Sequence, residues 1–566
     1  MNDVVSIPQR RSKKMNNSIV DKNWWKDEVI YQVYPKSFKD SNNDGIGDIP
    51  GIKEKLPYLK ELGITTLWIC PIFKSPMVDN GYDISDFEDI NPEFGTMLEF
   101  DELLAEAKSL GIKIILDLVI NHTSDEHEWF QKALADKNSK YRDYYIFKEG
   151  KEEPNNWRSI FGGSVWEKVP GEDCYYLHVF DKRQPDLNWE NEEVRQALYA
   201  MINRWLEKGI AGFRIDSITF IKKDQDYSSL PADGVDGLVS CKNKTRNRPG
   251  IESFLSELRR ETFDKYNCVT VGEAPGVPYE EFPQFIGDDG YFSMIFDFHY
   301  ADIDVESGSD WFKRTNWTTA EFKELLMNSQ HALQDAGWGA NFLENHDQPR
   351  VLSKLVKEGF RTPESAMGLA SMYFFLRGTP FIYQGQELGM LNAERTSIQQ
   401  FDDISSIDNY YRSIEEGFTP KEALDFVNLR SRDNTRTPMP WSSSQYGGFS
   451  EHEPWLAMTE EYPEINGTSN SVLEFYKQMI DLRQNSNVSS ILKRGSIEFL
   501  TDVSDNVVAY ERSLKNQKVY SITNLGTNVE EVQLPKAINN ILLHTHELNR
   551  TESKITLLPY QSILFN

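Results

Sequence analysis

The feature that most constrains the fold is an alternation of short apolar runs with longer amphipathic stretches. Strands are predicted for VIYQVYP (29–35), TTLWICP (65–71) and IKIILDLVINH (112–122). Helices are predicted between them, for IKEKLPYLKELG (52–63) and LEFDELLAEAKSLG (98–111). This rhythm is typical of parallel strands joined by crossover helices. Because the strands are apolar almost throughout, they are buried on both faces, which indicates a closed barrel or a doubly wound sheet.

The rhythm is interrupted once and stops before the C-terminus. It resumes with strands in IAGFRID (210–216), CVTVGEA (268–274) and GANFLENHD (339–347). The interruption is rich in Trp, Tyr, Gly and charge, and the last part of the chain has only short β-type runs. We therefore expect four parts: a flexible leader (1–22), a barrel (23–120 and 189–487), a subdomain inserted after the third strand (121–188) and a C-terminal antiparallel β-sandwich (488–566).

The net charge of −27 over 566 residues limits the partners that the chain can have. Nucleic acid, phosphorylated ligands and anionic membranes are disfavoured by such an acidic chain, whereas a neutral substrate fits it. The four cysteines have no CxxC spacing, so neither a zinc site nor a disulfide scaffold is indicated. The N-terminal segment lacks a secretory apolar core and no run has the length of a membrane span, which predicts a cytoplasmic enzyme.

Polar and charged clusters stand where four of the predicted strands end. They are Asp117 with Asn121 and His122, Arg214 with Asp216, Glu273, and Asn345 with His346 and Asp347. A single aspartate after a strand is often only the cap of the next helix. Four clusters in register with the repeat indicate a shared site instead, because the catalytic residues of a parallel barrel lie at the carboxyl ends of its strands.

Two carboxylates in different surroundings are what the cleavage of a glycosidic bond requires. Asp216 shares a strand face with Arg214, since side chains alternate with a period of two, and the guanidinium favours the ionised form that a nucleophile needs. Glu273 lies among apolar residues with no adjacent cation, so burial should raise its pKa and retain the proton that a general acid donates. Asp347 supplies a third carboxylate.

The segments DLVINH, GFRID, VGEA and ENHD, in this order, resemble the four signature regions of the α-amylase clan, glycoside hydrolase family 13. The resemblance covers nearly the whole chain and implies an α/β fold of the (β/α)8 TIM-barrel type. It implies Asp216 as the nucleophile, Glu273 as the general acid and base, and Asp347 as the stabiliser of the transition state. It also implies supporting roles: His122 and His346 bind sugar hydroxyls, Arg214 orients Asp216, and Asp117 holds the site together.

Two further segments, VDNGYDISDF (78–87) and RSRDNTRTPMPW (430–441), resemble the oligo-1,6-glucosidase and α-glucosidase branch of that family. In this branch an aspartate and an arginine, here Asp79 and Arg436, close the far wall of the pocket. A tyrosine, here Tyr82, stacks on the sugar. A structural ion pair is the alternative for Arg436. A pocket closed in this way admits one terminal glucose, which implies an exo-acting enzyme that releases α-glucose with retention.

In the resembling branch, the residue after the nucleophile tracks linkage preference. Valine there accompanies α-1,6 cleavage, and smaller or hydroxylated residues accompany α-1,4 bonds or sucrose. This chain has Ser217, although GEAPGV (272–277) is close to the α-1,6 type. We therefore expect a broad enzyme for short α-1,6 and α-1,4 substrates (isomaltose and maltose types), with sucrose as a further candidate substrate. Contacts in the +1 subsite are expected from Glu344 and Arg350.

Two other functions stay open. A sucrose isomerase or a transglucosidase would share all the catalytic residues. The arginine-rich loop usual in the isomerases is replaced here by DIDVESGSD (302–310), although WFKRTNWT (311–318) is similar to theirs. A catalytically dead relative that serves as an interaction scaffold would lack a catalytic carboxylate, and this chain keeps all three. The expected partner is a small oligosaccharide, and the expected assembly is a monomer, with a dimer as the alternative.

The segment DSNNDGIGD (40–48) alternates acidic and amide side chains and has glycine at its sixth position, like a calcium loop of the EF-hand type. The twelfth position is Gly51 instead of glutamate, and a polar turn is the alternative interpretation. The resembling branch carries a similar loop, which implies one structural Ca²⁺ or Mg²⁺ and no organic cofactor. The ligands would be the side chains of Asp40, Asn42, Asp44 and Asp48 and the carbonyl of Ile46.

Overall fold

The computed structural model describes residues 21–468 and 470–566, so the predicted leader (1–22) lies almost wholly outside the described residues. Eight parallel strands form a closed barrel and follow the chain order around it, with the last strand paired to the first. The predicted (β/α)8 barrel is thereby confirmed. Its strands are β1 (Ile30–Val33), β2 (Thr66–Ile69), β5 (Lys113–Leu118), β10 (Gly212–Ile215), β12 (Val269–Glu273), β13 (Met294–Phe296), β14 (Gly339–Asn341) and β15 (Thr379–Tyr383).

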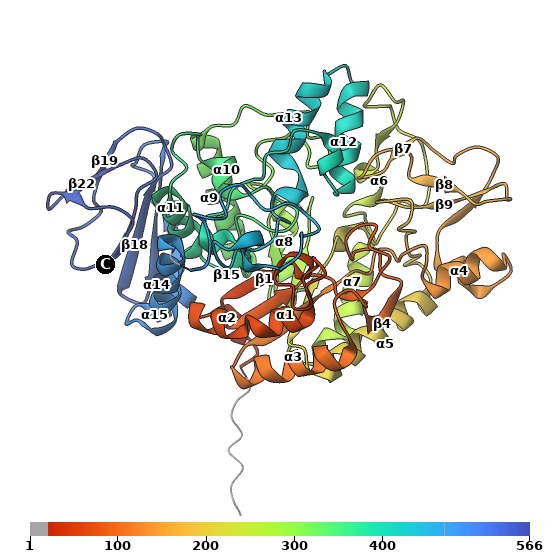
Figure 1. The fold of residues 1–566 in the computed structure, drawn as a ribbon, viewed down its shortest axis with the longest axis horizontal. Helices are drawn as coiled ribbons and strands as arrows, with labels where there is room; N and C mark the ends of the chain where they lie inside the picture. Colours follow the sequence, from red (N-terminus) through yellow and green to blue (C-terminus); the bar gives the residue numbers. More distant parts are fainter. Residues whose placement is uncertain (1–20, 469) are drawn as a thin grey trace, which may run out of the picture.

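Helices connect the barrel strands and surround them (Figure 1). The helix α3 begins with a capping box, in which the side chains of Thr96 and Glu99 each accept a hydrogen bond from the other residue's backbone N–H. The helix α5 ends at Gly209, whose φ of 108° favours glycine. The main helices of the barrel are α1 (Ile49–Glu54), α2 (Leu56–Leu62), α3 (Met97–Ser109), α5 (Glu192–Lys208), α7 (Ile251–Glu261), α8 (Phe282–Ile286), α9 (Thr319–Ala336), α11 (Pro363–Phe374) and α14 (Ser471–Asn485).

Shorter elements lie in the connections of the barrel. They are β3 (Phe73–Lys74), β4 (Asp86–Ile90), α6 (Lys242–Thr245), α10 (Val351–Leu355), α12 (Ile404–Glu415), α13 (Pro420–Arg430) and α15 (Ser489–Arg494). The strands β3 and β4 form an antiparallel ribbon after β2, and α12 packs against α13. Among the described residues, no helix combines the length and the apolar character needed to cross a membrane.

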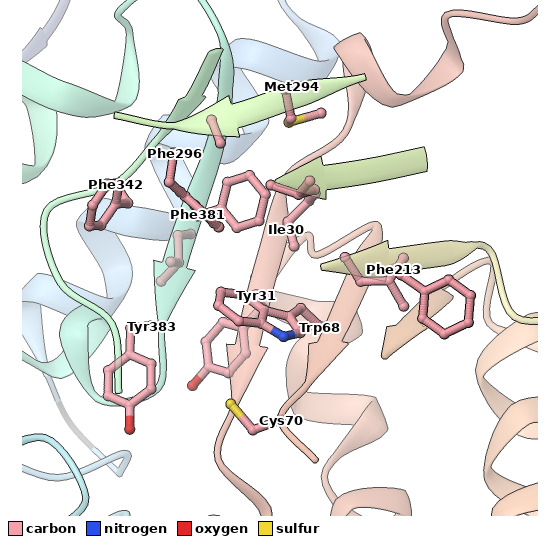
Figure 2. Packing of buried hydrophobic residues seen from close by; sticks show 14 of the residues in the cluster. Ile30, Tyr31, Trp68, Cys70, Phe213, Met294, Phe296, Phe342, Phe381 and Tyr383 are labelled. Carbon is pink, nitrogen blue, oxygen red and sulfur yellow. The ribbon is translucent and has the colours of Figure 1, made fainter. Parts of the chain in front are cut away.

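Aromatic rings fill the interior of the barrel (Figure 2). Phe296 on β13 packs against Phe381 on β15 with ring centroids 4.8 Å apart, and Trp68 on β2 packs against Phe296 at 5.8 Å. The indole N–H of Trp68 donates a hydrogen bond of 2.9 Å to Oδ2 of Asp117. This aromatic layer therefore fills the barrel directly beneath the polar side chains at the carboxyl ends of the strands.

The chain between β5 and α5 builds a small antiparallel sheet of its own. The strand β7 pairs instead with β11, which lies beyond β10 in the sequence. Phe220 and Val239, also beyond β10, pack in one apolar cluster with Trp157. The segment after β10 thus completes the core of this subdomain, which the sequence pattern did not indicate. The elements are α4 (Glu128–Ala135), β6 (Phe147–Glu149), β7 (Trp157–Arg158), β8 (Trp166–Lys168), β9 (Cys174–Leu177) and β11 (Val239–Ser240).

Two antiparallel sheets form the C-terminal part, in agreement with the predicted fold class. Val507 and Ile522 of the larger sheet share an apolar cluster with Val532 and Ile555 of the smaller one. Arg512 donates hydrogen bonds to two carbonyl groups directly after α11, which ties this part to the barrel. The strands are β16 (Ser496–Phe499), β17 (Val507–Leu514), β18 (Gln517–Asn524), β23 (Ser562–Phe565) and β20 (Ile541–His544) in the larger sheet, and β19 (Glu530–Gln533), β22 (Lys554–Leu557) and β21 (Asn549–Arg550) in the smaller one.

Candidate active site

A cavity of about 880 Å³ lies at the carboxyl ends of the barrel strands. Asp216 directly follows β10, Glu273 is the last residue of β12, and Asp347 lies in the loop after β14. All three carboxylates line the cavity. The structure therefore brings together the three residues predicted to be catalytic. Other predicted site residues that line it are Asp79, Tyr82, His122 and Ser217.

Arg214 lies at the centre of the carboxylates, and its side chain is only 1% exposed. Its Nη1 contacts Oδ1 of Asp117 at 2.6 Å and Oδ1 of Asp216 at 2.7 Å. Its Nη2 contacts Oε2 of Glu273 at 2.9 Å. The prediction that Glu273 has no adjacent cation was therefore wrong. The cation reaches it from the neighbouring strand, because β10 and β12 pair with Arg214 opposite Val271.

The pKa of Glu273 is nevertheless raised, to about 8. Burial is the main cause, and the charges of Asp216 and Asp347 add to it, while Arg214 opposes the rise. Burial also tends to raise the pKa of Asp347, but the charges of Arg432, Arg436 and Arg214 outweigh it and hold this pKa well below the ordinary range. The site thus holds one carboxyl group that keeps its proton at neutral pH beside another that does not.

Ser217 bridges the two carboxyl groups that the sequence predicted to react. Its backbone N–H donates to Oε2 of Glu273 at 2.7 Å, and its hydroxyl donates to Oδ2 of Asp216 at 2.8 Å. The residue has φ of 37° and ψ of 37°, a left-handed conformation that is uncommon for serine. Such backbone strain is found at functional sites, where the surrounding structure holds it. The sequence predicted a role in linkage preference but not these contacts.

Tyr82 lines the cavity and is held from behind by His346. The two rings stack with centroids 5.4 Å apart and 12° between their planes, and the Tyr82 hydroxyl is hydrogen-bonded to Nε2 of His346. Burial lowers the pKa of His346 to about 3, so this imidazole is neutral. His346 is fully buried and does not line the cavity, so its predicted contact with sugar hydroxyls is not seen.

His122 lines the cavity beside Tyr82. Its Nε2 lies 3.1 Å from the carbonyl oxygen of Tyr82, and burial lowers its pKa. Asp117, which the sequence assigned to support, does not line the cavity. It accepts hydrogen bonds from Trp68 and Arg214 and so fixes the arginine in place.

The far wall of the cavity contains an aspartate–arginine pair, but the arginine is not the predicted one. Asp79, between β3 and β4, contacts Nη2 of Arg432 at 2.9 Å, and Arg432 also contacts Asp403 at 2.7 Å. Arg436 is buried behind the cavity, where its Nη2 contacts Oδ1 of Asp347 at 2.9 Å. Arg432 therefore takes the wall position, and Arg436 supports Asp347.

Glu344 and Arg350, which were expected in the +1 subsite, do not line the cavity. Both are buried, and Arg350 Nη1 contacts Glu344 at 3.2 Å and the carbonyl oxygen of Gln384 at 2.8 Å. Burial raises the pKa of Glu344 to about 7. The expectation was wrong because these two side chains form an ion pair in the interior and do not reach the cavity.

The side of the cavity beyond Glu273 is formed by residues that sequence reasoning missed. They come from the region of α6, from the loops after β13 and β14 and from the end of α13. In the loops no periodic pattern marks the direction of a side chain. These residues are Lys242, Arg246, Asp302, Ser307, Ser309, Gln348 and Arg430. Arg430 and Gln348 both contact Asp302, at 2.8 and 3.1 Å.

The predicted cation loop (40–48) is closed by hydrogen bonds of its own. Asp40 accepts from the backbone N–H groups of Asn43 at 2.7 Å and Gly45 at 2.8 Å, and Asp48 caps α1 through the N–H of Gly51 at 2.6 Å. In the described part of the chain, the aspartates of this loop do not form a group whose carboxylate oxygens all lie within 4.8 Å of one another. The oxygen atoms of this loop are ligands of the kind that Ca²⁺ and Mg²⁺ prefer. The bound cation remains a prediction.

A closed parallel barrel with several carboxyl groups at the carboxyl ends of its strands fits a glycoside hydrolase, which needs a pair of carboxyl groups at one site. The chain belongs to the alpha-amylase family. The profile of the alpha amylase catalytic domain matches residues 32–495. The profile of the alpha-amylase SusG C-terminal domain matches residues 507–564. The family resemblance inferred from the sequence motifs is thereby confirmed.

The similar proteins include glucosidases, sucrose isomerases and trehalose-6-phosphate hydrolases. The chain is 44% identical over 561 residues to the probable oligo-1,6-glucosidase 3 of Bacillus subtilis (strain 168), covering 96% of this chain and 99% of that one. It is 41% identical over 560 residues to the oligo-1,6-glucosidase of Bacillus cereus, covering 96% and 100%. The crystal structure of the isomaltulose synthase from Protaminobacter rubrum has a TM-score of 0.89 at 39% identity, covering 96% and 99%. These similarities identify the chain as a glycoside hydrolase.

Proposed function

We propose that this chain is a retaining, exo-acting α-glucosidase that releases terminal glucose from short oligosaccharides with α-1,6 and α-1,4 bonds. The observation that carries the proposal is the contact of Arg214 with both Asp216 and Glu273, at 2.7 and 2.9 Å. One guanidinium thus holds two carboxyl groups at one site, and the pKa of about 8 keeps Glu273 protonated at neutral pH. Double displacement needs such a pair.

In the first step a carboxylate oxygen of Asp216 attacks C1 of the terminal glucose. As the bond between C1 and the glycosidic oxygen breaks, Glu273 gives its proton to that oxygen, and the remaining sugar leaves as an alcohol. The glucose is then held as an ester of Asp216. Asp347, whose pKa is kept low by the nearby arginines, remains ionised and stabilises the positive charge that develops on the sugar.

In the second step the ionised Glu273 takes a proton from a water molecule, and the oxygen of that water attacks C1. The ester bond breaks and Asp216 returns to its carboxylate form. Two inversions at C1 give α-glucose, so the configuration of the substrate is retained. The atoms balance with one water consumed for each bond cleaved.

The closed end of the cavity supports exo action. Asp79 and Arg432, joined at 2.9 Å, would bind the hydroxyls of the non-reducing glucose, and Tyr82 would pack against its ring. His122 would donate or accept a further hydrogen bond. We also propose that Ser217, which is smaller than valine, leaves the next subsite open to several linkages, sucrose included.

Sucrose isomerisation is the second candidate, because isomaltulose and trehalulose synthases are among the structures most similar to this chain. Incubation with sucrose separates the two. Glucose and fructose in equal amounts support hydrolysis, and accumulation of isomaltulose or trehalulose would overturn the hydrolase proposal. Panose and isomaltose, analysed in the same way by chromatography, report the α-1,6 component.

Azide rescue tests the roles of the two carboxyl groups directly. With Asp216→Ala, azide should attack p-nitrophenyl α-glucoside in a single displacement and give β-glucosyl azide. With Glu273→Ala, azide should attack the glucosyl ester and give α-glucosyl azide. Glu280→Gln, on an exposed residue of the same segment, is the control that should behave like the parent. The α-anomer from the Asp216 variant would contradict the assignment of the nucleophile.

We further propose that the loop at 40–48 binds one structural Ca²⁺ or Mg²⁺. The alternation of Asp and Asn oxygens, together with the Ile46 carbonyl, supports it. Such an ion would stabilise the connection between β1 and α1 and would take no part in the reaction.

A further inference from the structure

Two cations on the side of the cavity beyond Glu273 lack a carboxylate partner. Lys242 begins α6 and Arg246 follows that helix, so they lie one helical turn apart, and both line the cavity. Among the described residues, no carboxylate oxygen lies within 4.0 Å of either side-chain cation. The other lining arginines differ, because Arg430 contacts two aspartates and Arg432 contacts three. An unpaired cation in a cavity wall is costly unless a ligand supplies its partner.

Arg246 is held in place by the backbone of the loop that follows Glu273. A Cβ atom at Gly276 would lie 2.4 Å from Nε and 2.7 Å from Cζ of Arg246, so the guanidinium packs closely against this glycine. Gly276 has φ of 76°, which also favours glycine. The side chain of Arg246 makes no hydrogen bond within the described part of the chain, although burial lowers its pKa. All five of its N–H donors are therefore free for a ligand.

Lys242 arranges two hydroxyl groups beside it. Its Nζ donates to Oγ of Ser307 at 2.7 Å and to Oγ of Ser309 at 3.0 Å. The two hydroxyls line the cavity and are hydrogen-bonded to each other at 3.1 Å, so one of them keeps a proton that it can donate to a ligand. An ammonium, a guanidinium and one serine hydroxyl form a set of donors, which suits an anion with several oxygen atoms.

Two carboxylates on this side are already neutralised by arginines. Asp302 contacts Arg430 at 2.8 Å, and Asp310 contacts Arg412 at 2.7 Å. Among the described residues, Asp297 contacts His299 at 2.5 Å but no lysine or arginine, and Glu306 is exposed without a cation partner. The net charge of −27 does not prevent an anion from binding here, because charges farther away than about 8 Å are screened at physiological salt. Lys242 and Arg246 are nevertheless the lining cations that have no carboxylate within 4.0 Å among the described residues.

We propose that this group of residues, Lys242, Arg246, Ser307 and Ser309, is a subsite for a phosphate group on the leaving sugar. The closed end with Asp79 and Arg432 takes the terminal glucose, and Arg246 rests on the loop after Glu273, the proton donor to the leaving oxygen. The anion site therefore lies on the leaving-group side. The inference rests on the α-glucosidase function proposed above and extends its substrates to phosphorylated disaccharides.

The test compares neutral and phosphorylated forms of one substrate. We would measure kcat/KM for maltose and isomaltose and for the same sugars with a phosphate on O6 of the reducing glucose. The parent enzyme should favour the phosphorylated form. Arg246→Gln should reduce the ratio of the two kcat/KM values about 10- to 100-fold, because it removes charge-assisted hydrogen bonds. Arg246→Lys should restore part of the ratio.

Lys244→Gln is the matched control on the same helix. Lys244 does not line the cavity and contacts Asp226 at 3.0 Å, so its replacement should leave the ratio unchanged. Inorganic phosphate should inhibit the parent competitively and inhibit Arg246→Gln much less. Cleavage of neutral sugars without preference for the phosphorylated ones, or an equal loss on both in Arg246→Gln, would overturn the anion subsite alone. Failure to cleave either form would instead overturn the α-glucosidase proposal.

Discussion

The raised pKa of Glu273 should be visible in two independent measurements. Burial raises it from the ordinary value of 4.5 to about 8, with help from Asp216 and Asp347. Between those pH values the folded chain holds a proton that the unfolded chain has released. The free energy of unfolding must therefore fall as the pH rises from 4.5 to about 8, and the fall must stop above that range, because the folded state binds more protons.

Replacing Glu273 by glutamine removes this titration and keeps the size of the side chain. A pKa raised from 4.5 to about 8 corresponds to about 5 kcal/mol, at about 1.4 kcal/mol per pKa unit. The variant also loses the charge contact with Arg214, which reduces the gain. We expect the variant to be about 2 kcal/mol more stable than the parent above pH 8 and little different below pH 5. For a chain of this size that is about 2 °C in Tm.

Calorimetric melts from pH 5 to 9 at constant ionic strength measure the difference in Tm between variant and parent. The pH dependence of kcat/KM for p-nitrophenyl α-glucoside measures the same proton, because activity should fall as Glu273 loses it. The difference in Tm should level off near pH 8, and kcat/KM should begin to fall near the same pH. Glu280→Gln, on an exposed residue, is the control. A difference in Tm that does not vary with pH, or an alkaline limb of activity far from pH 8, would refute this reasoning.

Other changes test the remaining contacts of the site. Arg432→Gln leaves Asp79 without its cation and should reduce kcat/KM for isomaltose about 100-fold, mainly through KM; an unchanged KM would exclude it from the wall. Ser217→Val should raise the isomaltose-to-maltose ratio of kcat/KM about tenfold, and a lower ratio would contradict the proposed effect of its size. Dialysis against a chelator should lower Tm and added Ca²⁺ should restore it, whereas Asp40→Asn should abolish both responses; a Tm insensitive to chelator speaks for a polar turn.

The barrel and its catalytic clusters could be predicted because both follow from short-range patterns. Apolar runs and amphipathic stretches mark the strands and helices, and the carboxyl ends of parallel strands must share one rim. Asp216 and Glu273 therefore line the same cavity. The contact between Arg214 and Glu273 could not be predicted in this way, because it runs across two neighbouring strands instead of along one.

The direction of a side chain within a loop could not be predicted either. Arg432 and Arg436 stand four residues apart in one segment, and a 3-10 turn over Arg432–Asn434 places the first against Asp79 and the second under Asp347. The β11 strand, about 80 residues beyond its partner β7, likewise has no signal in the local pattern. Such contacts depend on the closed tertiary fold, which propensity and periodicity do not describe.

The contacts of Arg214 explain why the two reacting carboxyl groups must differ in protonation. The guanidinium meets Asp117 at 2.6 Å, Asp216 at 2.7 Å and Glu273 at 2.9 Å. One buried cation cannot neutralise three buried carboxylates, so the least costly arrangement leaves a proton on one of them.

The surrounding hydrogen bonds decide which group keeps that proton. Burial raises the pKa of Asp117 only to about 6, because the contacts with Arg214 and the indole N–H of Trp68 oppose the rise. Glu273 accepts one backbone N–H, which favours its ionised form, as the charge of Arg214 does. Burial and the charges of two aspartates favour the protonated form and outweigh both. The proton therefore stays on Glu273. The same arginine therefore contacts the nucleophile and the acid, and Glu273 keeps its proton because burial and the two aspartates outweigh the arginine there.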